Sequence, residues 1–231
     1  WLRWLRFCAG DWASMTRAKR HPGSGKSPDQ YPPGAVKLIV TAERLFGDHG
    51  IDGVSIRQIV SAAGMVNSYS IHHHFGSKEG LVQAVYDYRV PDFEAGCRQR
   101  LAAEMENDGG VTLQGLIAAR FMPLVDSFPS KIQQSYSKFL LRVLHRSGGE
   151  HPYFHSRVPQ PVSHGINEQL RALFPDLPVE VFNTRFSLAS DLFLGSMSEK
   201  RRLSATGNDP YSSERAYWRE IINMMAGIFS E

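Results

Sequence analysis

Residues 55–75 restrict the choice of fold more than any other stretch of the chain. They read SIRQIVSAAGMVNSYSIHHHF. Ser55, followed three residues later by Gln58, makes a capping-box pattern, which predicts that a short helix begins here. Gly64 can adopt the left-handed conformation that ends a helix, and a second short helix is expected from about Asn67 to His74. Two short helices joined by a glycine-containing turn are typical of a helix-turn-helix.

The second of these helices is expected to have two different faces. Ile71 and Phe75, together with Val66, can point back to the core. The polar side chains that then fall on the outer side, in pairs at i,i+4 spacing, are Ser68, Tyr69, His72 and His73. The second helix of a helix-turn-helix lies in the major groove, with its N-terminal residues nearest the base edges. Because Asn, Ser, Tyr and His side chains can hydrogen-bond bases or phosphates, the pattern predicts binding to double-stranded DNA.

The remainder of the chain has a helical pattern almost everywhere. Apolar residues recur at three- and four-residue spacing over 36–46, after the Pro32-Pro33 pair, which predicts a helix that closes at 47–50. Ser77 is expected to cap a fourth helix, and Pro91 is expected to end or kink it. Further helices are expected at 113–128, 131–146, 161–174, 178–203 and 213–229. No segment shows a sustained period of two, so the predicted fold class is all-α.

Composition and cysteine content exclude several other classes of protein. No apolar run approaches the roughly 20 residues that a membrane-spanning helix needs. The opening WLRWLRFCAGDWAS lacks the apolar stretch and the cleavage site of a signal peptide. The two cysteines, Cys8 and Cys97, form no CxxC pair, which favours a reducing compartment over a disulfide scaffold. We therefore expect a cytoplasmic protein with no membrane partner.

Charge is distributed unevenly along the chain. Residues 1–31 carry six basic and two acidic side chains, a net charge of +4, in a stretch rich in Pro, Gly and Ser. This composition predicts a disordered basic arm, which is either a plain solvated tail or a source of non-specific attraction to nucleic acid. Residues 32–90 carry five basic and five acidic side chains, so their net charge is zero.

Three consecutive histidines, His72 to His74, raise the alternative of a metal site. Adjacent residues on a helix point about 100° apart, so three in a row cannot converge on one ion. The HxxxH or HExxH spacing that would work is absent from this helix. The chain also lacks GxSxG, a phosphate-cradling glycine-rich loop and paired carboxylates in an apolar setting. We expect no metal, no cofactor and no enzymatic activity, with His74 half-buried at the helix junction.

The run from Ala35 to about Tyr88 resembles the DNA-binding domain of TetR-family (tetracycline-repressor-type) transcriptional regulators. The matching pieces are AVKLIVTAERLFGDHGIDGVSIRQIVSAAG and IHHHFGSKEGLVQAVYD, and the run that contains them covers roughly a quarter of the chain. The resemblance implies an N-terminal three-helix helix-turn-helix DNA-binding domain at residues 32–78. It implies a C-terminal helical domain at residues 79–231 that binds a ligand and dimerises. Residues 1–31 would precede both as the basic arm.

The resemblance also implies roles for single residues. It implies phosphate contacts from Ser55 and from Lys78 at the start of the fourth helix. It implies base or backbone contacts from Asn67, Ser68, Tyr69 and His73. Arg57 and His72 complete the set of expected DNA contacts.

The sequence departs from the family pattern in three places. The turn between Gly64 and Phe75 holds one residue more than the commonest form, which shifts the register of the recognition helix. His73 stands where the family often has a tyrosine. The recognition helix carries no Lys or Arg at all.

Two further sets of apolar residues point to partners. The last two predicted helices carry apolar side chains at three- and four-residue spacing, which predicts a four-helix dimer interface, with ordinary intrachain core as the alternative. The residues of this interface are Phe182, Phe186, Phe193, Met197, Tyr217, Trp218, Ile221 and Met225. A cavity for a small molecule is the second expectation, again with packed core as the alternative. Its lining would be Phe121, Met122, Phe128, Tyr136, Phe139 and Tyr153.

Together these features predict a homodimeric, sequence-specific regulator of transcription that binds a pseudo-palindromic operator. The expected mechanism is a repressor released from DNA by a small-molecule effector of unknown identity. Two alternatives stay open. One is a helical small-molecule-binding module without a DNA function, and the other is a histidine-based metal sensor.

Overall fold

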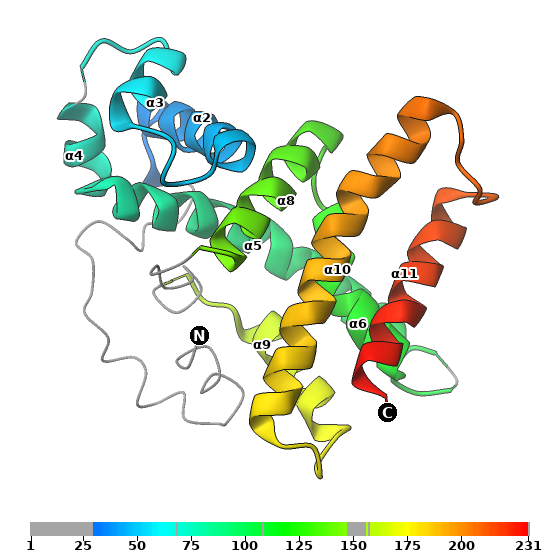
Figure 1. The fold of residues 1–231 in the computed structure, drawn as a ribbon. Coiled ribbons are helices and arrows are strands. Elements are labelled where there is room, and N and C mark those ends of the chain that lie inside the picture. The colour runs from blue at the N-terminus through cyan, green and yellow to red at the C-terminus, as the bar shows by residue number, and fades with distance from the viewer. Residues whose placement is uncertain (1–29, 68, 108, 147–155, 157, 231) are drawn as a thin grey trace. The chain divides into compact units, whose positions relative to one another are not determined.

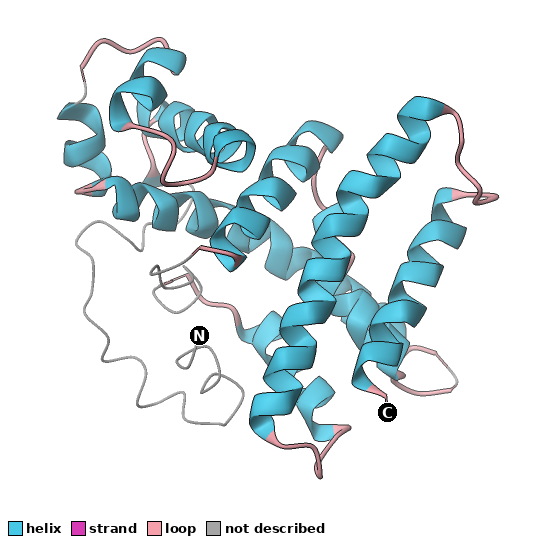
Figure 2. Cartoon of the chain, in the orientation of Figure 1, coloured by secondary structure: helices cyan, strands magenta, loops and turns pink. Residues whose placement is uncertain are grey.

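The chain folds into helices throughout the part that the structure describes. The computed structural model describes residues 30–67, 69–107, 109–146, 156 and 158–230. Within these ranges the ordered elements are all helices, joined by turns and loops, and no strand occurs (Figure 2). The expected all-α class is confirmed. In the same ranges no helix is both long and apolar enough to span a membrane.

Two compact units divide the chain, and each combines segments that are far apart in the sequence. We call the described residues of 13–93 and 131–160 the N-terminal unit. Those of 94–130 and 161–231 form the C-terminal unit. The chain passes from one unit to the other at 93/94, inside a single long helix.

The N-terminal unit is built around the first helices of the described chain (Figure 1). Its helices are α2 (Pro33–His49), α3 (Ile56–Ala62), α4 (Tyr69–Phe75), the first part of α5 (Lys78–Met105) and nearly all of α8 (Ser130–Leu144). Leu38, Phe46, Ile59 and Phe75 are fully buried and come from three of these helices. Phe46 stacks on Phe139 of α8, with ring centroids 6.4 Å apart. The apolar faces that the sequence predicts for α2, α3 and α4 thus share one core.

The ends of the short helices follow the capping chemistry of the sequence. Ser55 Oγ accepts a hydrogen bond from the Gln58 backbone N–H at 3.2 Å, and Gln58 Oε1 accepts one from the Ser55 N–H at 2.7 Å. This reciprocal pair is the predicted capping box. Gly64 has φ +62°, the left-handed conformation expected at the end of α3. Ser77 Oγ accepts a hydrogen bond from the Gly80 N–H at 3.0 Å, as expected of the residue that caps α5.

One local expectation is wrong. Val66 does not face the core: its side chain is 102% exposed, because α4 begins at Tyr69 and Val66 therefore lies in the preceding turn. Of the two alternatives expected for Pro91, a helix end is excluded, because α5 continues through it to Met105. A proline removes one helical hydrogen bond and crowds the carbonyl four residues earlier, and here the helix tolerates that local loss.

The C-terminal unit packs the rest of α5 with α6 (Leu113–Phe121), α7 (Pro123–Asp126), α9 (Pro161–Ala172), α10 (Val179–Thr206) and α11 (Glu214–Phe229). The helix expected over 113–128 is divided at Met122, and Pro123 occupies the first turn of α7. Helices α10 and α11 lie side by side (Figure 1). Aromatic rings fill the space between them, with Phe193 5.4 Å from Trp218 and Phe182 5.5 Å from Phe229 between centroids.

Candidate nucleic-acid interface

Helix α4 separates buried apolar residues from exposed polar ones. Ile71 and Phe75 are completely buried, as expected. Tyr69 is 66% exposed, and His72 and His73 are exposed as well. Ser68, the remaining member of the expected outer face, lies outside the described residues. The helix therefore offers an aromatic hydroxyl and imidazole groups to a partner while its apolar face holds it to the core.

Asn67 lies at the start of this surface, and its side chain can play two roles. Its side-chain oxygen Oδ1 accepts a hydrogen bond from the Tyr69 N–H at 2.9 Å, so it caps the start of α4. An Asn side chain also carries two N–H donors on its amide nitrogen. Because the oxygen is engaged by the helix, the amide nitrogen is the group that can meet acceptors such as base N7, O6 or O4 atoms.

The histidines of α4 do not form a cluster of ligands for one ion. His72 Nδ1 lies 3.2 Å from the Gly76 carbonyl oxygen, and since a carbonyl can only accept, Nδ1 carries the proton. The His73 ring stands 4.8 Å from that of His74 in an edge-on arrangement. His74 is half-buried, as expected. Over the described ranges, no three His, Cys, Asp or Glu side chains gather closely enough to hold a metal ion.

The three remaining expected DNA contacts differ in how accessible their polar groups are. Ser55 is exposed, but its hydroxyl donates to Gln58 Oε1 at 2.8 Å and also accepts from the Gln58 N–H. A phosphate at Ser55 would therefore have to displace the Gln58 side chain. Arg57 is exposed on α3, and Lys78, half-buried, is the first residue of α5.

Lys37 is a candidate residue that sequence reasoning missed. A Cβ atom on Gly64 would lie only 3.6 Å from Lys37 Nζ, and one on Gly34 would lie 3.8 Å from Met65 Cε. The turn between α3 and α4 thus rests against the first turns of α2, and α2 brings an exposed ammonium group to that turn. No sequence pattern signals this contact, because Lys37 lies on α2 and Gly64 in the turn after α3, and the contact depends on how α2 and α3 pack.

Four of the five carboxylates of residues 32–90 form ion pairs, and the fifth, Asp87, is buried. Glu43 accepts from Arg89 Nε at 2.7 Å, and Asp48 pairs with Lys138 Nζ at 2.7 Å. Asp52 and Glu79 both pair with Arg146, each at 2.7 Å. The hydrogen bonds from Lys138 and Arg146, reinforced by their positive charges, hold the pKa of Asp48, Asp52 and Glu79 below their usual values.

Of the five cations of residues 32–90, Arg89 is paired with Glu43, but the other four are not engaged in this way. Lys37, Arg44, Arg57 and Lys78 form no ion pair with any residue that the structure describes. The net charge of zero over 32–90 therefore conceals an asymmetry. Its negative charges are neutralised by other side chains or buried, and its uncompensated charges are positive.

The residues expected to line a ligand cavity are divided between the two units. Phe121, Met122 and Phe128 are buried in the C-terminal unit, where Phe121 packs against Phe193 at 5.4 Å between centroids. Tyr136 and Phe139 belong to the N-terminal unit and stack on each other at 6.0 Å. Tyr153 lies outside the described residues. Phe139 in particular serves the core beneath α2.

The eight residues expected at a dimer interface are buried within one chain. They are Phe182, Phe186, Phe193, Met197, Tyr217, Trp218, Ile221 and Met225, all below a tenth exposed. Their apolar faces meet because α10 and α11 pack on each other and on α6, so these side chains belong to the intrachain core. The apolar side chains that the same helices leave exposed are Val181, Leu188 and Met224.

Comparisons with known proteins agree with this architecture. The model of bacterial regulatory proteins of the tetR family matches residues 38–85, and that of the tetracyclin repressor-like C-terminal domain matches residues 100–227. The HTH-type transcriptional repressor KstR2 of Rhodococcus jostii (strain RHA1) is 29% identical over 107 residues, 46% of this chain and 48% of that protein. The HTH-type transcriptional regulatory protein RaaS of Mycobacterium tuberculosis (strain ATCC 25618 / H37Rv) is 43% identical over 63 residues, 27% of each chain.

This chain therefore spans about half the length of the first relative and about a quarter of the second. A crystal structure assigned to a tetR family transcription regulator from Shewanella sp. PV-4 aligns with 84% of this chain and 98% of its own, with 18% identity and a TM-score of 0.45. The two family models together match most of the described residues, and the C-terminal one alone matches more than half of the chain. The chain belongs to the tetR family of bacterial regulatory proteins.

Proposed function

We propose that this protein is a cytoplasmic, homodimeric transcriptional regulator that binds a specific DNA sequence through helix α4. The observation that carries the proposal is the division of α4 into a buried face, Ile71 and Phe75, and an exposed face that begins at Asn67 and Tyr69. A helix held in this way can enter the major groove without disturbing its own core.

Specificity would come from the first turn of α4 and the residues before it. The Asn67 amide nitrogen can donate to base acceptors, and the Tyr69 hydroxyl can both donate and accept. His73 lies beside Tyr69, with ring centroids 6.3 Å apart, and extends the same surface. The fully exposed Val66 adds an apolar group next to them, and apolar groups contact the methyl group of thymine.

Affinity would come from phosphate contacts made by neighbouring helices, since α4 itself carries no Lys or Arg. Three of the cations without an ion pair to a described residue are Lys37 of α2, beside the turn before α4, Arg57 on α3 and Lys78 at the start of α5. Each phosphate that a cation neutralises releases counterions, so binding should weaken steeply as salt is added.

Dimerisation would use the exposed rather than the buried residues of α10 and α11. Leu188 is 54% exposed and lies seven residues after Val181, so both fall on one side of α10. Met224 is exposed on α11, and a Cβ on Gly195 or Gly227 would have no atom within 4 Å. A symmetric pair carries two α4 helices, as binding to two half-sites of a palindrome about 34 Å apart requires.

Regulation would follow from a small molecule bound by the C-terminal unit. A relative of this chain is named a transcriptional repressor, which favours repression as the sign of regulation. A ligand can release DNA only if its affinity differs between the DNA-bound and the free arrangement of the helices. The chemical class of the effector is open.

Selection of bound sequences from a random pool of duplex DNA tests the proposal. We expect enrichment of an inverted repeat, together with loss of selective binding in Tyr69→Ala. Asn67→Asp should also lose selectivity although it keeps a capping oxygen, so that a defect in this variant reports on the amide donors and not on helix capping. If the wild-type protein enriches no sequence, it is a helical ligand-binding module without a DNA function, and the proposal is wrong.

The dimer surface has a separate test in solution. Leu188→Glu should shift sedimentation from dimer to monomer, because it places a carboxylate in the proposed apolar contact. Leu173→Glu is the matched control, since Leu173 is 48% exposed in the same unit but lies outside α10 and α11. Equal sedimentation of both variants with the wild type would place the interface elsewhere.

A further inference from the structure

Helix α8 and the turn that follows it supply counter-charges to the helix-turn-helix segment. Lys138 Nζ lies 2.7 Å from Asp48 Oδ1, at the end of α2. Arg146 lies 2.7 Å from Asp52, in the loop before α3, and 2.7 Å from Glu79, in the first turn of α5. These partners are separated by 90, 94 and 67 residues in the sequence.

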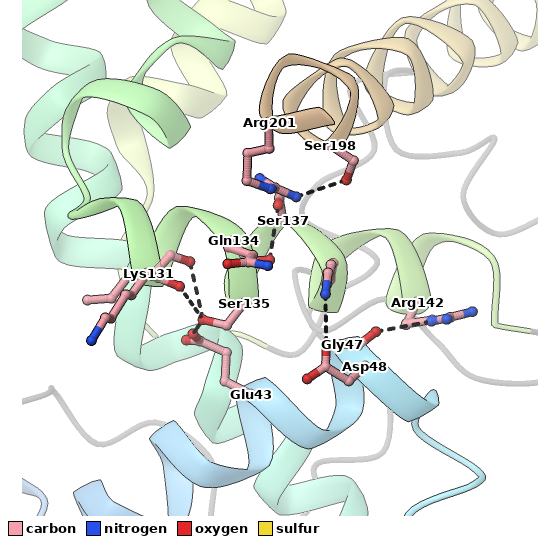
Figure 3. Close-up of polar contacts among 12 residues, drawn as sticks. Glu43, Gly47, Asp48, Lys131, Gln134, Ser135, Ser137, Arg142, Ser198 and Arg201 are labelled. Atoms are coloured by element: carbon pink, nitrogen blue, oxygen red, sulfur yellow. Dashed lines mark hydrogen bonds and ion pairs between the residues drawn. The ribbon is translucent and has the colours of Figure 1, made fainter. Parts of the chain in front are cut away.

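Helix α8, which carries Lys138, is closely docked to α2 (Figure 3). A Cβ on Gly47 would lie 2.9 Å from Lys138 Cβ and 3.0 Å from the Ser135 carbonyl oxygen, so α2 and α8 approach almost backbone to backbone. Ser135 Oγ donates to the buried carboxylate of Glu43, and Arg142 Nε donates to the Gly47 carbonyl oxygen at 3.4 Å. The packing of α8 against α2 therefore holds the Lys138 ammonium group close to Asp48.

The carboxylates concerned lie on the segment that would approach DNA. Asp52 is 71% exposed, and Asp48 and Glu79 are both partly exposed. Left alone, each would repel the phosphate backbone, and its effect would be felt over about a Debye length, roughly 10 Å at 0.1 M salt. Pairing with a cation removes that repulsion without adding a contact to DNA.

We propose that Lys138 of α8 and Arg146, two residues after the end of α8, act as an electrostatic cover for the DNA-binding segment: they raise DNA affinity without touching DNA. The inference rests on the proposed function. It adds to the DNA-contacting residues a second group, whose task is to neutralise acidic side chains. It also explains how a segment with no net charge, carrying a recognition helix without a basic residue, can bind a polyanion.

A double-mutant cycle on the most isolated pair tests the proposal. Binding of Lys138→Gln, Asp48→Asn and the double variant to the selected operator is measured by fluorescence anisotropy between about 50 and 300 mM salt. Lys138→Gln leaves Asp48 uncovered and should weaken binding about three- to five-fold at low salt, less at high salt. Asp48→Asn should bind at least as tightly as the wild type. The double variant, which has neither charge, should return to within about two-fold of the wild type.

The double-mutant cycle distinguishes neutralisation of Asp48 by Lys138 from a direct contact between Lys138 and DNA. If Lys138 touched a phosphate itself, that contact would still be missing from the double variant, so the added Asp48→Asn change would not restore binding. That result would overturn the proposal. Lys131→Gln is the matched control, since Lys131 is an exposed lysine on the same helix and forms no ion pair with the described residues. An equal loss in this variant would show an effect of net charge alone and would also overturn it.

Two further measurements distinguish a folding defect in a variant from a loss of DNA binding. Thermal unfolding of each variant, followed by circular dichroism, identifies a temperature at which all are folded, and binding is compared there. A wild-type protein that selects no DNA sequence refutes the proposed function. A wild type that binds its operator while Lys138→Gln binds equally well refutes only the cover.

Discussion

The two units stabilise their helix contacts by different physical means. In the C-terminal unit, α10 and α11 are joined by aromatic rings, including Phe182, Phe193, Trp218 and Phe229, which are all buried. In the N-terminal unit, α8 is joined to α2 by one stacked aromatic pair and by hydrogen bonds and ion pairs such as Lys138–Asp48. Apolar burial responds little to salt or pH, whereas partly exposed ion pairs respond to both. The unit that would bind DNA is thus the one whose packing senses the same ionic conditions as DNA binding.

Phe193→Ala should destabilise the protein most, because it removes a ring from the apolar packing of the C-terminal unit. Phe193 is completely buried, and its ring lies 5.4 Å from both Phe121 and Trp218. Removing a buried phenyl ring costs about 3–5 kcal/mol, through lost burial and the cavity that remains. Urea denaturation at fixed protein concentration measures the loss, which should be equal at low and high salt. A loss below about 1 kcal/mol, or the same loss in the exposed-site control Leu173→Ala, would contradict the packing described here.

Gly47→Ala should destabilise the protein less, by disrupting the contact between α2 and α8 in the N-terminal unit. The new Cβ would meet Lys138 Cβ at 2.9 Å and backbone of α8 at 3.0 Å, so α8 has to move away. Overpacking typically costs about 1–3 kcal/mol, and the better helix propensity of alanine returns up to about 1, which leaves a net loss of about 1–2 kcal/mol.

Gly165→Ala is the control for this substitution. Gly165 lies inside α9, and a Cβ there would have no atom within 4 Å. Its replacement should be neutral or should stabilise the protein by up to about 1 kcal/mol, since only the helix propensity changes. Equal unfolding curves for both alanine variants would show that α8 does not depend on a close approach to α2.

The comparison also explains which parts of the fold the sequence could predict. Apolar spacing on α10 and α11 predicts the helices and their apolar faces, because burial imposes a period on the sequence. The same spacing cannot say whether those faces are covered by the chain itself or by a second copy. Eight residues were therefore expected at a dimer interface and lie in the intrachain core.

The candidate site shows a similar division between local and distant information. The capping box of Ser55 and Gln58 and the left-handed Gly64 were predictable, because each depends on neighbours within a few residues. The start of α4 was less so, because capping by Asn67 begins the helix at Tyr69 and leaves Val66 in the turn. The pairing of Lys138 with Asp48 was beyond prediction, because charged surface residues follow no period and the partners are 90 residues apart.

Glu79→Gln should cause only a small loss of stability, and this loss should depend on pH. Hydrogen bonding to Arg146, reinforced by its charge, lowers the pKa of Glu79 in the folded protein. A lowered folded-state pKa contributes stability above the ordinary glutamate value of about 4.3, and this contribution is lost as the pH falls through the lowered value. Since Glu79 is partly exposed, we expect a loss of only about 0.3–1 kcal/mol at pH 7 and a smaller loss near pH 3. Urea denaturation at both pH values measures this difference, and Glu106→Gln, an exposed site with no ion pair to the described residues, should match the wild type throughout. A difference between Glu79→Gln and the wild type that persists unchanged at low pH would mean that the side chain contributes by packing and not by its charge.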